Sequence, residues 1–324
     1  MNKFSNLIYI TYQTFPANTA NSLQSITNIS ELVRQGIEVK LIFPDRDNQS
    51  SDSLDEIQDF YGIEEDFEII KLNHNLPFGK FKFFNKISYH LSHYIWSKKT
   101  VKTLINSSKD ECFFTRSDWI FYFLSKHKKH VIFECHQPSK LRNIILKICL
   151  KKETSKIIFL NDSLYKNYKN LIKFNSNYIV LNNGYKNTLF KNKVKKNNNQ
   201  IIFVGELLRF GSTRNIEFII SCFEDPRLDK FNLKIIGGPE KYLNELKRNR
   251  KDELPNNIKF LGRLSHLNTV KMLQESEIGL LINSSKNNHS VKFTSPLKYF
   301  EYLAAELKIV AVDFNSHREL PFAR

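Results

Sequence analysis

Short apolar runs alternate with segments of helical periodicity along the chain. Residues 7–10 form the first run, residues 14–22 a polar loop, and apolar side chains then recur at helical spacing over residues 23–33. Gly36 ends this predicted helix, and residues 37–43 form the next apolar run. Apolar runs separated by helices are typical of buried parallel strands joined by right-handed crossovers. The pattern therefore predicts a β-α-β unit.

The same alternation continues along the chain and predicts two domains. Residues 191–200 are polar and charged without periodicity, which indicates a linker. We therefore expect one α/β domain over residues 1–190 and another over residues 201–324, while residues 46–75 are not assigned. Further strands are expected at residues 111–116, 131–136, 157–160, 178–181, 200–204, 233–236, 258–261, 278–282 and 308–312. Because no closing helix follows the last strand, we expect the second domain to be incomplete.

Polar side chains stand at the ends of two predicted strands. Thr115 and Arg116 end one strand, and Glu134 and His136 end the next. In open α/β sheets, ligands gather at the carboxyl ends of strands, so these residues are candidates for a site. A lone histidine is more often structural, but His136 alternates with a glutamate at such an end. The first loop lacks G-x-G-x-x-G, which argues against a nicotinamide dinucleotide site there.

The segment over residues 293–306 predicts a short helix. Ser295 is suited to the N-cap and Pro296 to the first helical position. Lys298 lies in the first turn, where a cation is unfavourable unless an anion compensates it, and Glu301 follows one turn later. Together with the free N–H groups of the helix start, they predict a pocket for a diphosphate joined to a sugar. On these residues alone, however, a capped, partly buried helix with an ordinary surface Lys and Glu is the favoured interpretation.

The net charge of +16 favours anionic partners: nucleic acid, an anionic membrane face or phosphorylated substrates. Residues 77–99 are rich in basic and aromatic side chains. This composition fits three alternatives: docking on such a membrane, stacking on bases, or a buried helix whose lysines face solvent. No apolar stretch is long enough to span a membrane, and no signal peptide is found. Four cysteines without C-x-x-C spacing indicate a reduced compartment. We expect a cytoplasmic protein, soluble or peripheral on the inner membrane face.

Two consecutive Rossmann-like halves, the second with a phosphate helix, resemble the GT-B glycosyltransferases. The motifs resemble glycosyltransferase family 4, the retaining group 1 enzymes, nearly end to end. The matching segments are the first loop at residues 14–22, the Glu-x-His strand end at 133–136, the Asn-Gly turn at 181–184, the second-domain start at 203–205, and residues 295–301 with 303–305 and Val310. The resemblance implies two parallel sheets that face a central cleft.

The resemblance also implies roles for residues at the donor site. Ser295, the backbone of Pro296 and Leu297, and Lys298 would hold the diphosphate. Glu301 would bond the ribose hydroxyls of the nucleotide.

Other implied roles concern the donor sugar and the acceptor. His136 would contact the donor sugar at the catalytic centre. Glu134 and three residues of the first loop, Asn18, Asn21 and Ser22, would approach the donor sugar and the acceptor.

Glycines and arginines of the second domain complete the implied donor site. Gly205 and Gly237 would let the backbone approach the ligand closely. Arg214 stands where the family has a lysine and would act with Lys298 on the diphosphate, with Arg209 as the competitor for this role. An arginine binds phosphate bidentately, and such cations offset the charge that develops on the leaving group. The resemblance implies that this happens without a metal, so no metal or other cofactor is expected.

The sequence departs from the family pattern at two positions. Phe293 replaces the first acid of the family's Glu-x7-Glu pattern, which normally touches the donor sugar. Glu206 replaces the arginine that follows the Val-Gly pair. The family also continues with another strand and helices after residue 324, so we expect a truncated chain.

The resemblance implies transfer of a sugar from a nucleoside-diphosphate sugar to a glycan or lipid-linked acceptor, with retention, in polysaccharide, lipopolysaccharide or other glycoconjugate assembly. One alternative is a sugar-nucleotide epimerase of the same fold. Another is a catalytically degenerate protein that binds a nucleotide sugar or an anionic surface. A nucleic-acid-binding protein is supported by charge alone, and we expect no nucleic-acid partner. No pair of carboxylates supports a glycoside hydrolase.

Overall fold

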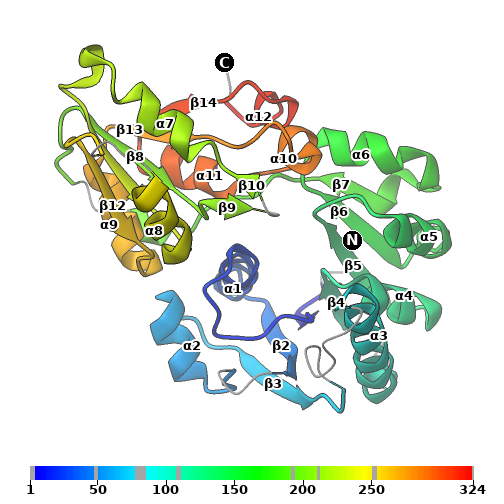
Figure 1. The fold of residues 1–324 in the computed structure, drawn as a ribbon. Coiled ribbons are helices and arrows are strands. Elements are labelled where there is room, and N and C mark those ends of the chain that lie inside the picture. Colours follow the sequence, from blue (N-terminus) through cyan, green and yellow to red (C-terminus); the bar gives the residue numbers. More distant parts are fainter. Residues whose placement is uncertain are drawn as a thin grey trace. The chain divides into compact units, whose positions relative to one another are not determined.

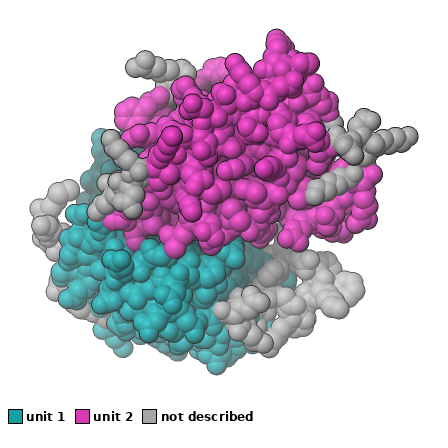
Figure 2. Space-filling view, turned by 90° about the vertical axis from the view of Figure 1, so that its left-hand side faces the viewer, with its two compact units in different colours: residues 1–181 teal, residues 182–324 magenta. Residues whose placement is uncertain are grey.

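The computed structural model describes residues 4–46, 50–76, 85–106, 111–190, 194–209, 212–249 and 254–322. The chain divides into two compact units, Met1–Leu181 and Asn182–Arg324, which Figure 2 distinguishes by colour. Residues 182–190, expected in the first domain, thus belong to the second unit. Of the expected linker, residues 191–193 lie outside the described residues.

A parallel seven-stranded sheet forms the centre of the first unit, in the order β3-β2-β1-β4-β5-β6-β7 (Figure 1). The strands are β1 (Asn6–Ile10), β2 (Glu38–Asp45), β3 (Glu68–Asn73), β4 (Cys112–Thr115), β5 (His130–Cys135), β6 (Ser155–Phe159) and β7 (Tyr178–Val180). The chain adds β2 and β3 on one side of β1 and then β4 to β7 on the other. The structure therefore confirms the predicted parallel sheet.

Helices cover both faces of this sheet. Two helices, α1 (Ala20–Arg34) and α2 (Leu54–Tyr61), pack on one face through a core that includes Ile26, Ile29 and Ile57. On the other face, α4 lies between α3 and α5 (Figure 1). The remaining helices of the unit are α3 (Asn85–Leu104), α4 (Asp118–Lys126), α5 (Lys140–Cys149), α6 (Asp162–Tyr168) and the 3-10 helices Lys169–Leu171 and Asn175–Asn177.

Two local predictions for this unit were wrong or incomplete. Helix α1 begins inside the expected polar loop of residues 14–22, because the Thr19 hydroxyl accepts a hydrogen bond from the Ser22 amide and caps the helix there. The unassigned residues 46–75 contain both α2 and β3. Of residues 77–99, the part from Asn85 onward is helical, and residues 77–84 lie outside the described residues.

The second unit repeats this architecture around a parallel five-stranded sheet, in the order β12-β11-β8-β13-β14. Its strands are β8 (Gln200–Val204), β11 (Asn232–Ile236), β12 (Ile258–Gly262), β13 (Ile278–Leu281) and β14 (Lys308–Ala311), with a small antiparallel pair, β9 (Leu208–Arg209) and β10 (Ser212–Thr213). One core joins α7 and α8 to the sheet, and another joins α9 and α11 to it. The helices are α7 (Ile216–Cys222), α8 (Glu240–Asn249), α9 (His266–Glu275), α10 (Asn288–Lys292), α11 (Leu297–Ala304), α12 (Asn315–Arg318) and the 3-10 helices Asn187–Phe190 and Pro226–Leu228.

The backbone turns that follow β8 and β11 are in direct contact. The Gly205 amide donates to the Ile236 carbonyl at 2.9 Å. A Cβ atom on Gly237 would lie 1.8 Å from the Gly205 carbonyl oxygen, and one on Gly205 would lie 2.6 Å from Nη1 of Arg214. Only glycine therefore fits at position 237 without movement of the neighbouring backbone.

We predict that Gly237→Ala destabilises the second unit by about 3 kcal/mol, because the added methyl group overpacks against backbone rather than a flexible side chain. The measurement is the denaturant midpoint of unfolding of the full chain. Gly184→Ala is the control, since a Cβ there would meet nothing within 4 Å. Equal midpoints for the two variants would contradict the prediction.

Candidate functional site

Each sheet has a point where the direction of strand addition reverses, between β1 and β4 in the first unit and between β8 and β13 in the second. At such a point, the loops at the carboxyl ends diverge and leave room for a ligand. Thr115 at the end of β4 donates its hydroxyl hydrogen to the Ile10 carbonyl at 2.7 Å, which ties the two strand ends together. In the second unit, the Asn215 side chain donates to the Asn283 carbonyl at 3.2 Å, which joins the start of α7 to the loop after β13.

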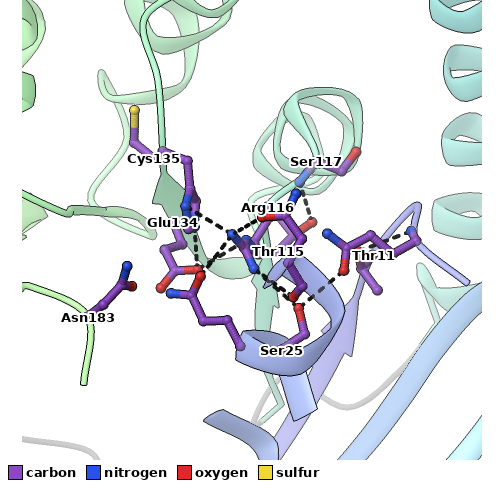
Figure 3. Close-up of polar contacts among 12 residues, drawn as sticks. Thr11, Ser25, Thr115, Arg116, Ser117, Glu134, Cys135 and Asn183 are labelled. Atoms are coloured by element: carbon purple, nitrogen blue, oxygen red, sulfur yellow. Dashed lines mark hydrogen bonds and ion pairs between the residues drawn. The ribbon is translucent and has the colours of Figure 1, made fainter. Parts of the chain in front are cut away.

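Arg116, Glu134 and His136 form a compact cluster at the first of these points, and Figure 3 shows Arg116 between Glu134 and Ser25. Nε of Arg116 lies 3.2 Å from a carboxylate oxygen of Glu134, and Nε2 of His136 lies 2.8 Å from the same oxygen. Nδ1 of His136 lies 2.9 Å from the Arg116 guanidinium. The structure thus brings together the polar residues predicted at the ends of two strands.

The cluster determines the charge of its members. Burial lowers the pKa of His136 to about 4, and the positive charge of Arg116 acts in the same direction. Burial raises the pKa of Glu134, but the hydrogen bond from His136 and the charge of Arg116 outweigh it and hold that pKa below its usual value. At neutral pH, His136 is therefore neutral and Glu134 is ionised.

Only part of the predicted loop set joins this cluster. Asn21 accepts two hydrogen bonds from Arg116, through its carbonyl at 3.2 Å and its side-chain oxygen at 3.1 Å. Ser22 is buried, and its hydroxyl bonds the Thr19 side chain at 2.8 Å. Asn18 is exposed.

In the second unit, α11 starts one residue later than predicted. Pro296 is its N-cap, and no side chain caps it. The Ser295 hydroxyl instead accepts a hydrogen bond from the Asn183 amide at 3.1 Å, and the Asn183 side chain donates to the Ser295 carbonyl. Ser295 therefore holds the turn that begins this unit, a role that its local sequence did not indicate.

Glu301 is the centre of a second buried cluster. Only 6% of its side chain is exposed, and its two oxygens are paired with Lys298 and with Nε2 of His266, the latter at 3.1 Å. Burial raises the pKa of Glu301, but the Lys298 charge and the His266 hydrogen bond outweigh it and lower that pKa to about 2. His266 was not predicted, although its place shortly after the strand that ends at Gly262 is a signal of the same kind as that of His136.

The remaining predicted residues of this unit lie around Gly205. Arg214 packs its guanidinium against Gly205, and its amide donates to the Leu207 carbonyl at 3.0 Å. Glu206 forms a 2.8 Å ion pair with Arg263, in which both side chains are about half exposed. The side chain of Arg209 lies outside the described residues.

Gly205 and Gly237 were expected to let the backbone approach a ligand. In the structure, their close neighbours are protein groups, the Arg214 side chain for Gly205 and the Gly205 carbonyl for Gly237. Within the described ranges, no three His, Cys, Asp or Glu side chains are grouped so that they would hold a metal ion.

Comparison with known proteins gives a family match for the second unit. Residues 198–321 match the family model described as glycosyl transferases group 1. A search of curated proteins found no match.

Solved structures resemble the whole chain at low sequence identity. Anabaena HepE in complex with UDP and glucose superposes with a TM-score of 0.60 at 12% identity over 96% of this chain and 82% of its own. A glycosyltransferase from Rickettsia africae gives a TM-score of 0.62 at 16% identity, over 98% of this chain and 82% of its own. S. aureus TarM, in a complex that contains UDP, gives 0.64 at 12% identity, over 95% and 86%. The chain therefore has the GT-B fold of these glycosyltransferases, as the sequence predicted, and its residues 198–321 match the group 1 family.

Proposed function

We propose that this protein is a glycosyltransferase of family 4 type. It transfers a sugar, with retention, from a nucleoside-diphosphate sugar to a glycan or lipid-linked acceptor in the assembly of cell-surface polysaccharide or another glycoconjugate. The family match of residues 198–321 supports the reaction class. The observation that carries the proposal is the Lys298–Glu301–His266 cluster at the start of α11, in the unit that contains this match.

The cluster explains how the second unit would hold a donor. A diphosphate would compete with Glu301 for the Lys298 ammonium, because the diphosphate of a nucleotide sugar carries two negative charges and the carboxylate carries one. Release of Lys298 would free one oxygen of Glu301 to accept hydrogen bonds from ribose hydroxyls. His266 would keep the other oxygen in place.

The chemical step needs stabilisation of the charge that develops on the leaving diphosphate. We assign this role to Lys298 and Arg214, with the Ser295 hydroxyl and the backbone at Pro296 and Leu297 as further contacts. The two cations would make a metal ion unnecessary.

The first unit would contribute His136 to the donor-sugar site and the start of α1 to the acceptor site. Both ring nitrogens of His136 are engaged within its cluster. The ring would therefore bond a sugar hydroxyl only by exchanging one of these partners.

The exposed helices of the first unit suggest a membrane-facing surface, and we propose that it docks on an anionic lipid bilayer. In α3, Ile87, Leu91 and Ile95 are exposed at a spacing of four residues. In α5, Ile144 and Ile148 are exposed. Exposed lysines share these helices, at positions 98, 99, 102, 140 and 147. Apolar side chains among lysines suit the interface of an anionic leaflet. None of the described helices combines the length and the hydropathy that a membrane-spanning segment needs.

Donor binding is tested by a thermal-shift screen against UDP, GDP, ADP, CMP and their sugars. A ligand at a hundred times its dissociation constant adds about 2.7 kcal/mol to the free energy of unfolding. We expect one nucleotide family to raise the melting temperature, and the shift to disappear in Arg214→Ala and Glu301→Ala. Arg227→Ala is the control, because its guanidinium is paired at an exposed site of the same unit.

Two outcomes of this screen would contradict the donor site. One is the absence of a shift with every nucleotide. The other is a shift that both variants retain. An epimerase would convert the bound sugar nucleotide without an acceptor, and a degenerate binder would leave it unchanged, so product analysis after incubation separates these alternatives from transfer.

Membrane docking is tested by sedimentation with liposomes. We expect the protein to bind vesicles that contain anionic lipid, to bind neutral vesicles weakly, and to lose binding as salt rises. Leu91→Asn should weaken binding several-fold, because it removes an apolar contact. Phe218→Asn, which changes an exposed aromatic residue of the second unit, should not. Equal binding to both kinds of vesicle would argue against this surface.

A further inference from the structure

The sequence predicted Arg116 only as a polar residue at the end of a strand, but in the structure its side chain contacts several neighbours. Only 7% of its side chain is exposed. Nη1 donates to the Asn21 carbonyl at 3.2 Å and to the Ser25 hydroxyl at 3.3 Å, and Nη2 donates to the Gln24 side chain at 3.2 Å. With its bonds to Glu134 and His136, the guanidinium connects the end of β4 to the start of α1 and the end of β5.

These contacts fix the tautomer of His136. A guanidinium only donates hydrogen bonds, so Nδ1 of His136 accepts the bond from Arg116 and carries no hydrogen. The ionised carboxylate of Glu134 only accepts, so Nε2 carries the ring's hydrogen and donates it at 2.8 Å. The ring is then held from both sides in one orientation.

Charged groups on each neighbouring element act on this ring. Glu134 of β5 favours its protonated form, whereas Arg116 after β4 and Arg142 of α5 oppose it. Arg142 is paired with Asp118 of α4 at 2.7 Å, so a carboxylate already compensates its charge. Arg116 is therefore the cation in direct contact with His136 that opposes protonation.

We propose that Arg116 is a positioning residue that holds His136 as the neutral Nε2–H tautomer in a single orientation. Its relevance to catalysis rests on the proposed function, in which His136 faces the donor sugar. A histidine that turned or took up a second proton would present a different hydrogen-bonding surface to that sugar. The tautomer and the orientation of His136, however, are properties of the protein without any ligand.

Nitrogen-15 NMR of histidine-labelled protein tests the claim, with the His136 signals assigned by comparison with His136→Gln. In the unsubstituted protein we expect an unprotonated Nδ1, a protonated Nε2 and a titration midpoint near pH 4. In Arg116→Met, the midpoint should rise by about one pH unit or more, because the opposing cation is lost while Glu134 remains. Nδ1, no longer required to accept a hydrogen bond, should then carry a larger share of the hydrogen than in the unsubstituted protein, although the Glu134 carboxylate still favours Nε2–H.

Two further variants separate positioning from general damage. Arg116→Lys keeps the charge and a hydrogen-bond donor but not the planar set of donors, so it should raise the midpoint less than Arg116→Met and leave the hydrogen on Nε2. Ser25→Ala removes another partner of Arg116 and should leave the His136 signals unchanged.

The proposal is overturned if Nδ1 is protonated in the unsubstituted protein, a result that requires no variant to fold. It is equally overturned if Arg116→Met keeps the original midpoint or the original share of hydrogen on Nε2. Because no nucleotide or acceptor is present, these results do not depend on the transferase proposal. Failure of the nucleotide screen with the expected NMR result would reject only the proposed function.

Discussion

In a parallel sheet, each strand leaves its last carbonyl and the following amide at the carboxyl edge. In both sheets of this protein, the direction in which strands are added reverses beside the first strand. The reversal parts the loops after β1 and β4, and those after β8 and β13. Polar groups placed after these strands can face a ligand without disturbing the sheet hydrogen bonds. Arg116 directly follows β4, and Gly205 directly follows β8. The candidate residues thus depend on topology first and on local sequence second.

Both clusters contain a buried carboxylate that stays ionised. A carboxylate that is almost fully buried loses its hydration, and it stays ionised only if nearby donors replace the lost water. Glu134 is paired with Arg116 and His136, and Glu301 is paired with Lys298 and His266. In each case the paired groups outweigh burial and lower the pKa of the carboxyl group. The two clusters differ in their cation. Arg116 makes many fixed contacts, whereas Lys298 makes few, so a ligand would have fewer contacts to displace at Lys298.

The sequence predicted the strands well, because fully buried strands are continuous apolar runs such as residues 200–204. It did not predict α2 and β3, because these elements are only partly buried and their apolar residues are interrupted by charges. It placed His136 at the end of a strand and Glu301 one turn into a helix. It did not predict the contact of His266 with Glu301 or that of Ser295 with Asn183, because each joins residues far apart in the chain. Short-range patterns carry no signal for such pairs.

The two departures from the family pattern change the charge at the second site in opposite directions. Phe293, in place of the acid, is the C-cap residue of α10 and adds no negative charge. Glu206, in place of the arginine, is neutralised by Arg263, so its carboxylate need not repel a diphosphate as an unpaired acid would. Among the described side chains of this edge are the cations Arg214, Arg263 and Lys298 and the anions Glu206 and Glu301. Positive charge beside a helix start favours a leaving diphosphate, and the departures leave in place the two cations assigned to it, Arg214 and Lys298.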